Sequence, residues 1–189
     1  MKTTSIMIVG VGGQGTLLAS KLLGNVLLKQ GYDVKLSEVH GMSQRGGSVV
    51  TYVRYGDKVY SPIVDQGEAD YILSFEILES ARWISYLKKG GKLITNTQKT
   101  WPMPVITGAM AYPEGIVEKL SQMADVRAVD ALKLATEAGS PKAVNVVLIG
   151  VLSRIMDIPE EVWLKAIDET VPPKFLELNK KAFALGRDA

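Results

Sequence analysis

The sequence predicts an α/β fold with a mostly parallel sheet flanked by helices and a helical C-terminal third. Short apolar runs alternate with helical patterns over residues 6–129, as they do in successive strand–helix units. From residue 131 onward every pattern is helical. A glycine-rich turn, residues 10–15, joins the first strand to the first helix, and this arrangement is typical of Rossmann-like domains.

The expected strands are short runs that are apolar or rich in β-branched residues. Residues 6–9 (Ile6-Met7-Ile8-Val9) are continuously apolar, as in a parallel strand buried on both faces. A strand at 49–55, a Gly56-Asp57 turn and a return through Val59-Tyr60 resemble a hairpin with a two-residue loop. The other strands are expected at 33–39, ending near Glu38, and at 70–75, 92–96 and 126–129.

The expected helices follow from apolar spacing and from their end signals. Residues 14–30 repeat apolar side chains at i+4, and Gly31 is a good residue just past the helix end. Ser140 and Pro141 form the N-cap and N1 pair of a helix to Met156. An extended loop is expected at 101–104, because each proline restricts its neighbour. The remaining helices are expected at 77–87, 115–123, 131–138, 159–169 and 174–185.

Composition narrows the class of protein. The 189 residues suit one domain, 1–189, and 47% hydrophobic with 22% charged residues is ordinary for a globular chain. A net charge of +2 does not indicate a basic surface for binding nucleic acid, and no apolar run reaches the length of a membrane span. Because the start lacks the features of a signal peptide, a cytoplasmic location is expected.

The chain has no cysteine and a single histidine, His40. These counts exclude disulfides, thiolate nucleophiles, cysteine-ligated iron–sulfur clusters and multi-histidine metal sites within the chain. Electron carriers in any redox reaction must therefore be bound cofactors or belong to a partner.

The first glycine turn has the form G-x-G-x-x-G through Gly10, Gly12 and Gly15. The N–H groups and dipole at the start of the following helix favour a phosphate. Glu38 ends the next strand, where a ribose-binding acid is expected. The alternative is a turn that only packs tightly. No Gly-Lys-Ser/Thr follows the glycines, so an ATP-hydrolysing P-loop is excluded.

The second turn, Ser43-Gln44-Arg45-Gly46-Gly47, follows the second strand. Arg45 could hold a phosphate or carboxylate with two hydrogen bonds, and Ser43 and Gln44 add donors. The alternative is a solvated arginine in a tight loop.

Four other side chains have simpler interpretations. His40 is interpreted as a hydrogen-bonded structural residue rather than an acid–base catalyst, since nothing nearby forms a dyad with it. Asn145 is interpreted as a buried asparagine that satisfies loop backbone groups. Trp101 and Trp163 are interpreted as packing residues or partner contacts.

Taken together, the first turn and the run Glu38-Val39-His40-Gly41-Met42-Ser43-Gln44-Arg45-Gly46-Gly47-Ser48-Val49 resemble one family. The chain is similar to the small (beta) subunit of indolepyruvate:ferredoxin oxidoreductase and, more broadly, to the gamma domain of the 2-oxoacid:ferredoxin oxidoreductases. The segments 145–150, 159–161 and 179–186 also match that family.

The resemblance implies a division of labour within a cytoplasmic complex. A large catalytic (alpha) subunit would carry thiamine diphosphate and the iron–sulfur clusters. The complex would oxidatively decarboxylate an arylpyruvate with coenzyme A, release an arylacetyl-CoA and reduce ferredoxin. The isolated chain is expected to be inactive, and it could pair with itself when its partner is absent.

On this reading the glycine turns either contact coenzyme A or form the subunit interface. The candidate cofactor-binding residues are Gly10, Gly12, Gly13, Gln14, Gly15, Thr16, Glu38, Ser43, Gln44, Arg45, Gly46 and Gly47. No residue of this chain is expected to be catalytic or to bind a metal.

Three alternatives stay open at this stage. The first is a stand-alone NAD- or NADP-dependent dehydrogenase, with Glu38 on a ribose hydroxyl and His40 as acid–base. The second is an interaction module that binds no small molecule. The third keeps the family but changes the substrate to pyruvate, 2-oxoglutarate or another 2-oxoacid.

Overall fold

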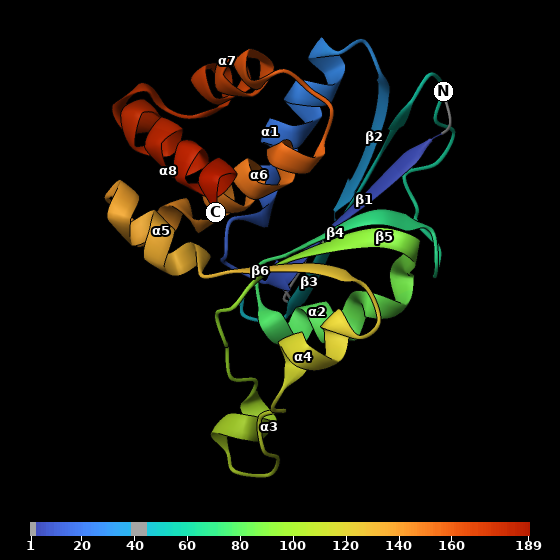
Figure 1. Ribbon diagram of the computed structural model, residues 1–189, viewed down its shortest axis with the longest axis vertical. Helices are drawn as coiled ribbons and strands as arrows, with labels where there is room; N and C mark the ends of the chain where they lie inside the picture. Colours follow the sequence, from blue (N-terminus) through green and yellow to red (C-terminus); the bar gives the residue numbers. More distant parts are fainter. Residues whose placement is uncertain (1–2, 39–44) are drawn as a thin grey trace.

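A computed structural model describes residues 3–38 and 45–189 (Figure 1). Its described strands form one six-stranded sheet in the order β2-β3-β1-β4-β5-β6. Strands β1, β4, β5 and β6 pair parallel, whereas β3 is antiparallel to both of its neighbours. The prediction of a mostly parallel α/β sheet is confirmed. The strands are β1 (Thr4–Val11), β2 (Asp33–Glu38), β3 (Ser48–Gly56), β4 (Ala69–Ser74), β5 (Leu87–Asn96) and β6 (Asp125–Val129).

Helices cover both faces of the sheet (Figure 1). The helices α1 and α5 to α8 lie over one face, and α2 and α4 lie over the other. The α-helices are α1 (Thr16–Lys29), α2 (Ile77–Trp83), α3 (Met103–Ile106), α4 (Ile116–Ser121), α5 (Ala131–Ala138), α6 (Val144–Ile155), α7 (Glu160–Thr170) and α8 (Leu176–Asp188). Short 3-10 turns are η2 (Ile84–Tyr86), η3 (Pro141–Ala143) and η4 (Pro173–Phe175). The helical C-terminal third is also confirmed.

Strand β1 divides the core into two layers. Successive side chains of a strand point to opposite faces of the sheet. Ile6 and Ile8 therefore pack into the larger cluster with α1 and α6 to α8, while Met7 and Val9 pack into the smaller one with α2 and α4. All four side chains are fully buried. This explains why the first strand reads as a continuous apolar run.

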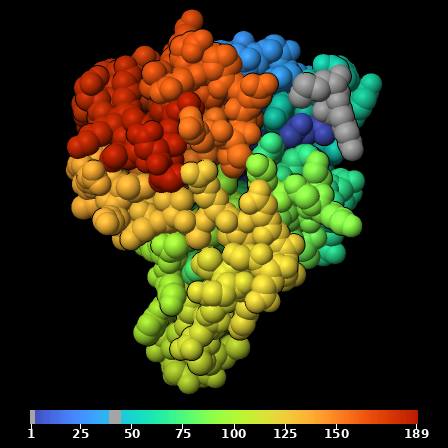
Figure 2. All heavy atoms as spheres, in the orientation of Figure 1, coloured from blue at the N-terminus to red at the C-terminus, as the bar shows by residue number. Residues whose placement is uncertain are grey.

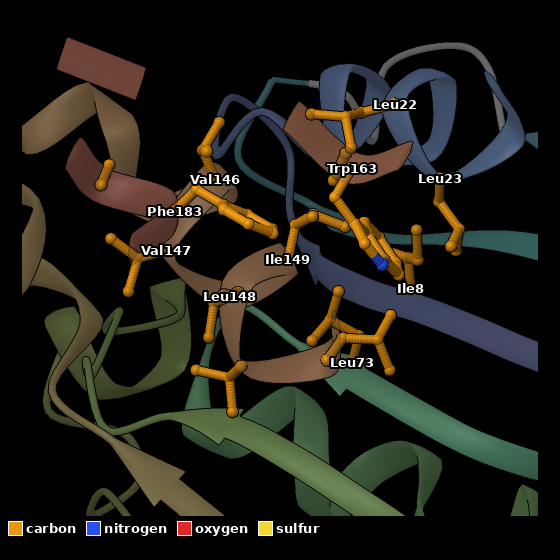
Figure 3. Packing of buried hydrophobic residues seen from close by; sticks show 14 of the residues in the cluster. Ile8, Leu22, Leu23, Leu73, Val146, Val147, Leu148, Ile149, Trp163 and Phe183 are labelled. Carbon is orange, nitrogen blue, oxygen red and sulfur yellow. The ribbon is translucent and has the colours of Figure 1, made fainter. Parts of the chain in front are cut away.

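The larger layer is built around α6, which is buried over most of its length. In Figure 3 the side chain of Trp163 points from α7 toward β1, where Ile8 lies. The rings of Trp163 and Phe183 stack, with centroids 6.2 Å apart. Trp163 is therefore a packing residue, as one of the two sequence interpretations held.

Helices α6 and α8 approach each other closely at two glycines. A Cβ built on Gly150 would lie 3.1 Å from the Cα of Gly186, and a Cβ on Gly186 would overlap the backbone of Val147. Only glycine allows two helix backbones to approach this closely at both positions.

The hairpin expected at 49–60 is wrong. Residues 57–68 contain no strand, because β1 and β2 already occupy the two edges of β3. Val59 is buried, and its N–H donates to the carboxylate of Asp33 at 2.8 Å instead of to a strand.

The extended loop expected at 101–104 is also wrong in part, because α3 begins at Met103. Pro102 is its N-cap, and Pro104 lies in the first turn, where a missing N–H has no helical partner to lose. Strand β5 begins at Leu87, five residues before the predicted strand at 92–96, and the helix predicted at 77–87 ends as α2 at Trp83. The remaining predicted elements appear within a few residues of their expected ends, and Gly31 has φ +80° just past α1.

Within the described part of the chain, no helix has the length and apolar character needed to cross a membrane.

Candidate functional site

The two glycine turns meet at one corner of the sheet. Val11 at the end of β1 is paired with Ser48 at the start of β3, and the N–H of Gly12 donates to the carbonyl of Gly47 at 2.9 Å. The two turns meet because β3 lies between β1 and β2 and carries the second turn to β1.

The first turn leads into an uncapped helix start. Gln14 closes the turn by accepting the N–H of Val11 on its side-chain oxygen at 2.8 Å. Gly13 and Gly15 have φ of +100° and +86°, which L-residues with a Cβ rarely adopt. Gly15 is the N-cap of α1, and a glycine has no side chain with which to cap the helix. The first N–H groups of α1 are therefore suited to an anion.

A cavity of about 290 Å³ lies against this helix start. Glu38 faces it from the end of β2, and its carboxylate accepts a hydrogen bond from the hydroxyl of Ser20 at 2.8 Å. The cavity is lined by Gly12, Gly13, Gly15, Thr16, Leu17, Glu38, Val49, Val50 and Thr51. A carboxylate held in this way can accept hydroxyl donors such as those of a ribose, while the helix start favours a phosphate.

The cavity gathers five of the predicted site residues, Gly12, Gly13, Gly15, Thr16 and Glu38, while Gly46 and Gly47 line a separate cavity. Gly10 ends the buried part of β1, and Arg45 and Gly46 are exposed at the second turn. His40, Ser43 and Gln44 lie outside the described residues. The described residues hold no cluster of histidine and acidic side chains that could bind a metal ion.

Asn145 contacts the end of the first glycine turn through a hydrogen bond to its backbone. It is buried at the start of α6, and its side-chain amide donates to the carbonyl of Gly15 at 3.4 Å. The interpretation of Asn145 as a buried residue that satisfies a loop backbone group is confirmed.

Replacement of Gly15 with alanine is expected to lower stability by about 2 kcal/mol, because φ is positive and the new Cβ would lie 2.8 Å from the Asn145 amide nitrogen. Thermal unfolding measures the loss. The matched control is Gly13→Ala, where φ is also positive but the Cβ meets no described residue within 4 Å, so its loss should be smaller. Equal losses for the two variants would contradict the packing of Asn145 against the turn.

Two buried acids that sequence reasoning missed lie at the start of α2, beside the second glycine turn. Glu76 and Glu79 are 1% and 4% exposed at the start of α2, beside a second cavity of about 150 Å³. The sequence pattern that could have indicated them is a pair of glutamates three residues apart, directly after the predicted strand at 70–75. One carboxylate oxygen of Glu76 caps α2 by accepting the N–H of Glu79 at 2.9 Å.

The other oxygen of Glu76 holds both ends of a projecting segment. It accepts the N–H of Thr100 at 2.9 Å and the hydroxyl of Tyr112 at 2.7 Å. Burial, and then the hydrogen bond to Glu76, raises the pKa of Tyr112 far above its usual value, so this phenol keeps its proton. Residues 100–113, here called the arm, extend from the body of the molecule (Figures 1 and 2).

The comparisons with known proteins agree with this geometry. The family described as pyruvate ferredoxin/flavodoxin oxidoreductase matches residues 5–189. The chain belongs to this family. The indolepyruvate oxidoreductase subunit IorB of Pyrococcus horikoshii is 48% identical over 98% of this chain and 95% of its own length. Its counterpart from Archaeoglobus fulgidus is 39% identical over 96% of this chain and 92% of its own length.

Solved structures show the same fold. Pyruvate oxidoreductase subunit PORC from Thermotoga maritima matches with a TM-score of 0.76 at 24% identity, over all of this chain and 97% of that one. A 2-oxoglutarate:ferredoxin oxidoreductase from Magnetococcus marinus, solved with 2-oxoglutarate, coenzyme A and succinyl-CoA bound, matches over 31% of its length with a TM-score of 0.74 at 19% identity. The resemblance drawn from the two motifs is confirmed, and the chain is a subunit of an oxidoreductase complex.

Proposed function

We propose that this chain is the small, non-catalytic subunit of a complex that oxidatively decarboxylates indolepyruvate and related arylpyruvates with coenzyme A, reducing ferredoxin. The 48% identity to an indolepyruvate oxidoreductase subunit over 98% of the chain carries the proposal. A large subunit would hold the thiamine diphosphate and the iron–sulfur clusters. This assignment agrees with the absence of cysteine from the sequence.

We assign a supporting role at the coenzyme A site to the two glycine turns. The uncapped start of α1 and the exposed Arg45 supply donors for phosphate oxygens, and Glu38 accepts a ribose hydroxyl. The cavity of about 290 Å³ suits the phosphate end of such a ligand, so the thiol would reach out toward the partner. When bound, coenzyme A accepts the acyl group, and residues of this chain only hold it in place.

The arm supports the presence of a large partner. No charged residue occurs between Lys99 and Glu114, and Trp101, Met103, Ile106 and Met110 are 59–65% exposed. Exposed apolar side chains gathered in this way are typical of a protein interface. The base of the arm lines the second cavity together with Gly46 and Gly47, so a partner bound to the arm would reach the glycine turns.

The alternative functions considered from the sequence have less support than this proposal. A nicotinamide-dependent dehydrogenase gains no support, since none of the relatives described above is named as one. A different 2-oxoacid substrate is an outcome of the test below. The single-domain organisation over residues 1–189 and the cytoplasmic location stay predictions.

The test is reconstitution with the large subunit expressed from the same source. The purified complex is assayed for ferredoxin reduction with indolepyruvate, phenylpyruvate, pyruvate and 2-oxoglutarate, each with and without coenzyme A. We expect coenzyme A-dependent turnover that is fastest with the arylpyruvates, and none from the small chain alone. Faster turnover of pyruvate or 2-oxoglutarate would reassign the substrate, and turnover by the chain alone would overturn the proposed role.

A further inference from the structure

Glu79 is a buried acid with several donors around it. Its carboxylate accepts the hydroxyl of Ser48 at 2.5 Å and the indole N–H of Trp83 at 3.3 Å, and it pairs with the guanidinium of Arg82 at 3.2 Å. A carboxylate this deeply buried is costly unless such donors compensate it. Two of them, Arg82 and Trp83, belong to its own helix, whereas Ser48 comes from β3.

Ser48 connects this carboxylate to the second glycine turn. It directly follows Arg45-Gly46-Gly47, and the carbonyl of Gly47 accepts the N–H of Gly12. Gly47 is thus held by the first glycine turn, while Ser48 is held through its pairing with Val11 of β1 and, at its hydroxyl, by Glu79 of α2. Gly46 has φ +91°, and no described residue lies within 4 Å of a Cβ built on it, so packing against the described part of the chain does not fix the turn there.

We propose that Glu79 is a positioning residue for the coenzyme A site. By holding Ser48 it sets the Arg-Gly-Gly turn against the start of α1, so that Arg45 and the helix N–H groups meet the same phosphate group. This inference rests on the proposed function. Its physical basis is preorganisation: a turn that is already ordered loses less conformational freedom when the ligand binds.

The test measures the coenzyme A dissociation constant of the purified complex by calorimetry, together with kcat at saturating coenzyme A. Ser48→Ala removes the hydroxyl that Glu79 holds, and we expect a dissociation constant about three- to tenfold higher with kcat unchanged. Ser48→Thr keeps the hydroxyl and should restore wild-type affinity. Glu79→Gln keeps an oxygen that can accept the Ser48 hydroxyl but removes the charge that strengthens this contact, so it should weaken binding less than Ser48→Ala does. In the Ser48→Ala background it should add nothing to the loss of affinity, since its other partners, Arg82 and Trp83, lie on its own helix and not on the turn.

Ser80→Ala is the matched control. It removes a buried hydroxyl from the same helix, one that contacts Thr95 at 2.6 Å and not the turn, so coenzyme A affinity should not change. Unchanged affinity in Ser48→Ala would overturn the proposal, as would an equal loss in Ser80→Ala.

Arg45→Ala separates this proposal from the proposed function. If Arg45→Ala weakens coenzyme A binding and Ser48→Ala does not, the site stands and the role of Glu79 is refuted. If neither variant changes the affinity, the assignment of the glycine turns to coenzyme A fails as well.

Discussion

Replacing Gly186 with alanine is expected to destabilise the chain by about 3 kcal/mol, because the new methyl group would overlap the backbone of Val147 on the facing helix. Helix α6 is buried over most of its length, so neither helix can move aside without opening the larger core layer. Denaturant unfolding of the isolated chain, followed by circular dichroism, measures the loss.

Gly24→Ala is the control for this substitution. Gly24 lies inside α1, and a Cβ there meets only the methyl end of Leu36 at 3.3 Å, which can rotate away. Its stability should change by about 1 kcal/mol or less, and the higher helix propensity of alanine favours the variant. Wild-type stability in Gly186→Ala would contradict the close approach of α6 and α8.

Ile106→Asp is expected to weaken association with the large subunit about 30-fold or more while leaving the unfolding temperature of the small chain unchanged. Ile106 is 59% exposed on α3, and the projecting arm holds no charged residue along 100–113. A carboxylate placed there would be buried without a partner in an apolar interface. Because Glu76 holds both ends of the arm, it presents a preformed surface.

Biolayer interferometry between the two purified subunits measures this effect. Leu28→Asp is the matched control, since Leu28 is 61% exposed on α1 and does not belong to the arm. Equal association for wild type and Ile106→Asp would remove the arm from the interface. An equal loss in Leu28→Asp would show a general effect of the added charge.

Local signals predicted much of this fold. The apolar run of β1, the glycines of the first turn and the i+4 pattern of α1 act over a few residues, so sequence alone defined these elements. The false hairpin at 56–60 shows the limit. Gly56-Asp57 is suited to a turn that reverses the chain. A returning strand, however, also needs a free sheet edge to pair with, and β1 and β2 occupy both edges of β3.

The site residues likewise fall into those that a local pattern predicts and those that only the folded chain brings together. Glu38 was predicted near the glycines because of a spacing rule, and it does line the cavity, although β3 separates its strand from β1. The contact between Glu79 and Ser48 joins residues far apart in the sequence. No local pattern indicates such a pairing, because it arises only when α2 packs beside the start of β3.

The most direct test of the central claim is the coenzyme A dissociation constant of the complex carrying Arg45→Ala. If the two glycine turns form one anion site, the constant should rise about tenfold or more, as the loss of a charge-assisted contact to a phosphate predicts, while the subunits stay associated. Unchanged affinity for coenzyme A in the intact complex would contradict this claim, and a loss of subunit association in its place would make the glycine turns a subunit interface that binds no small molecule.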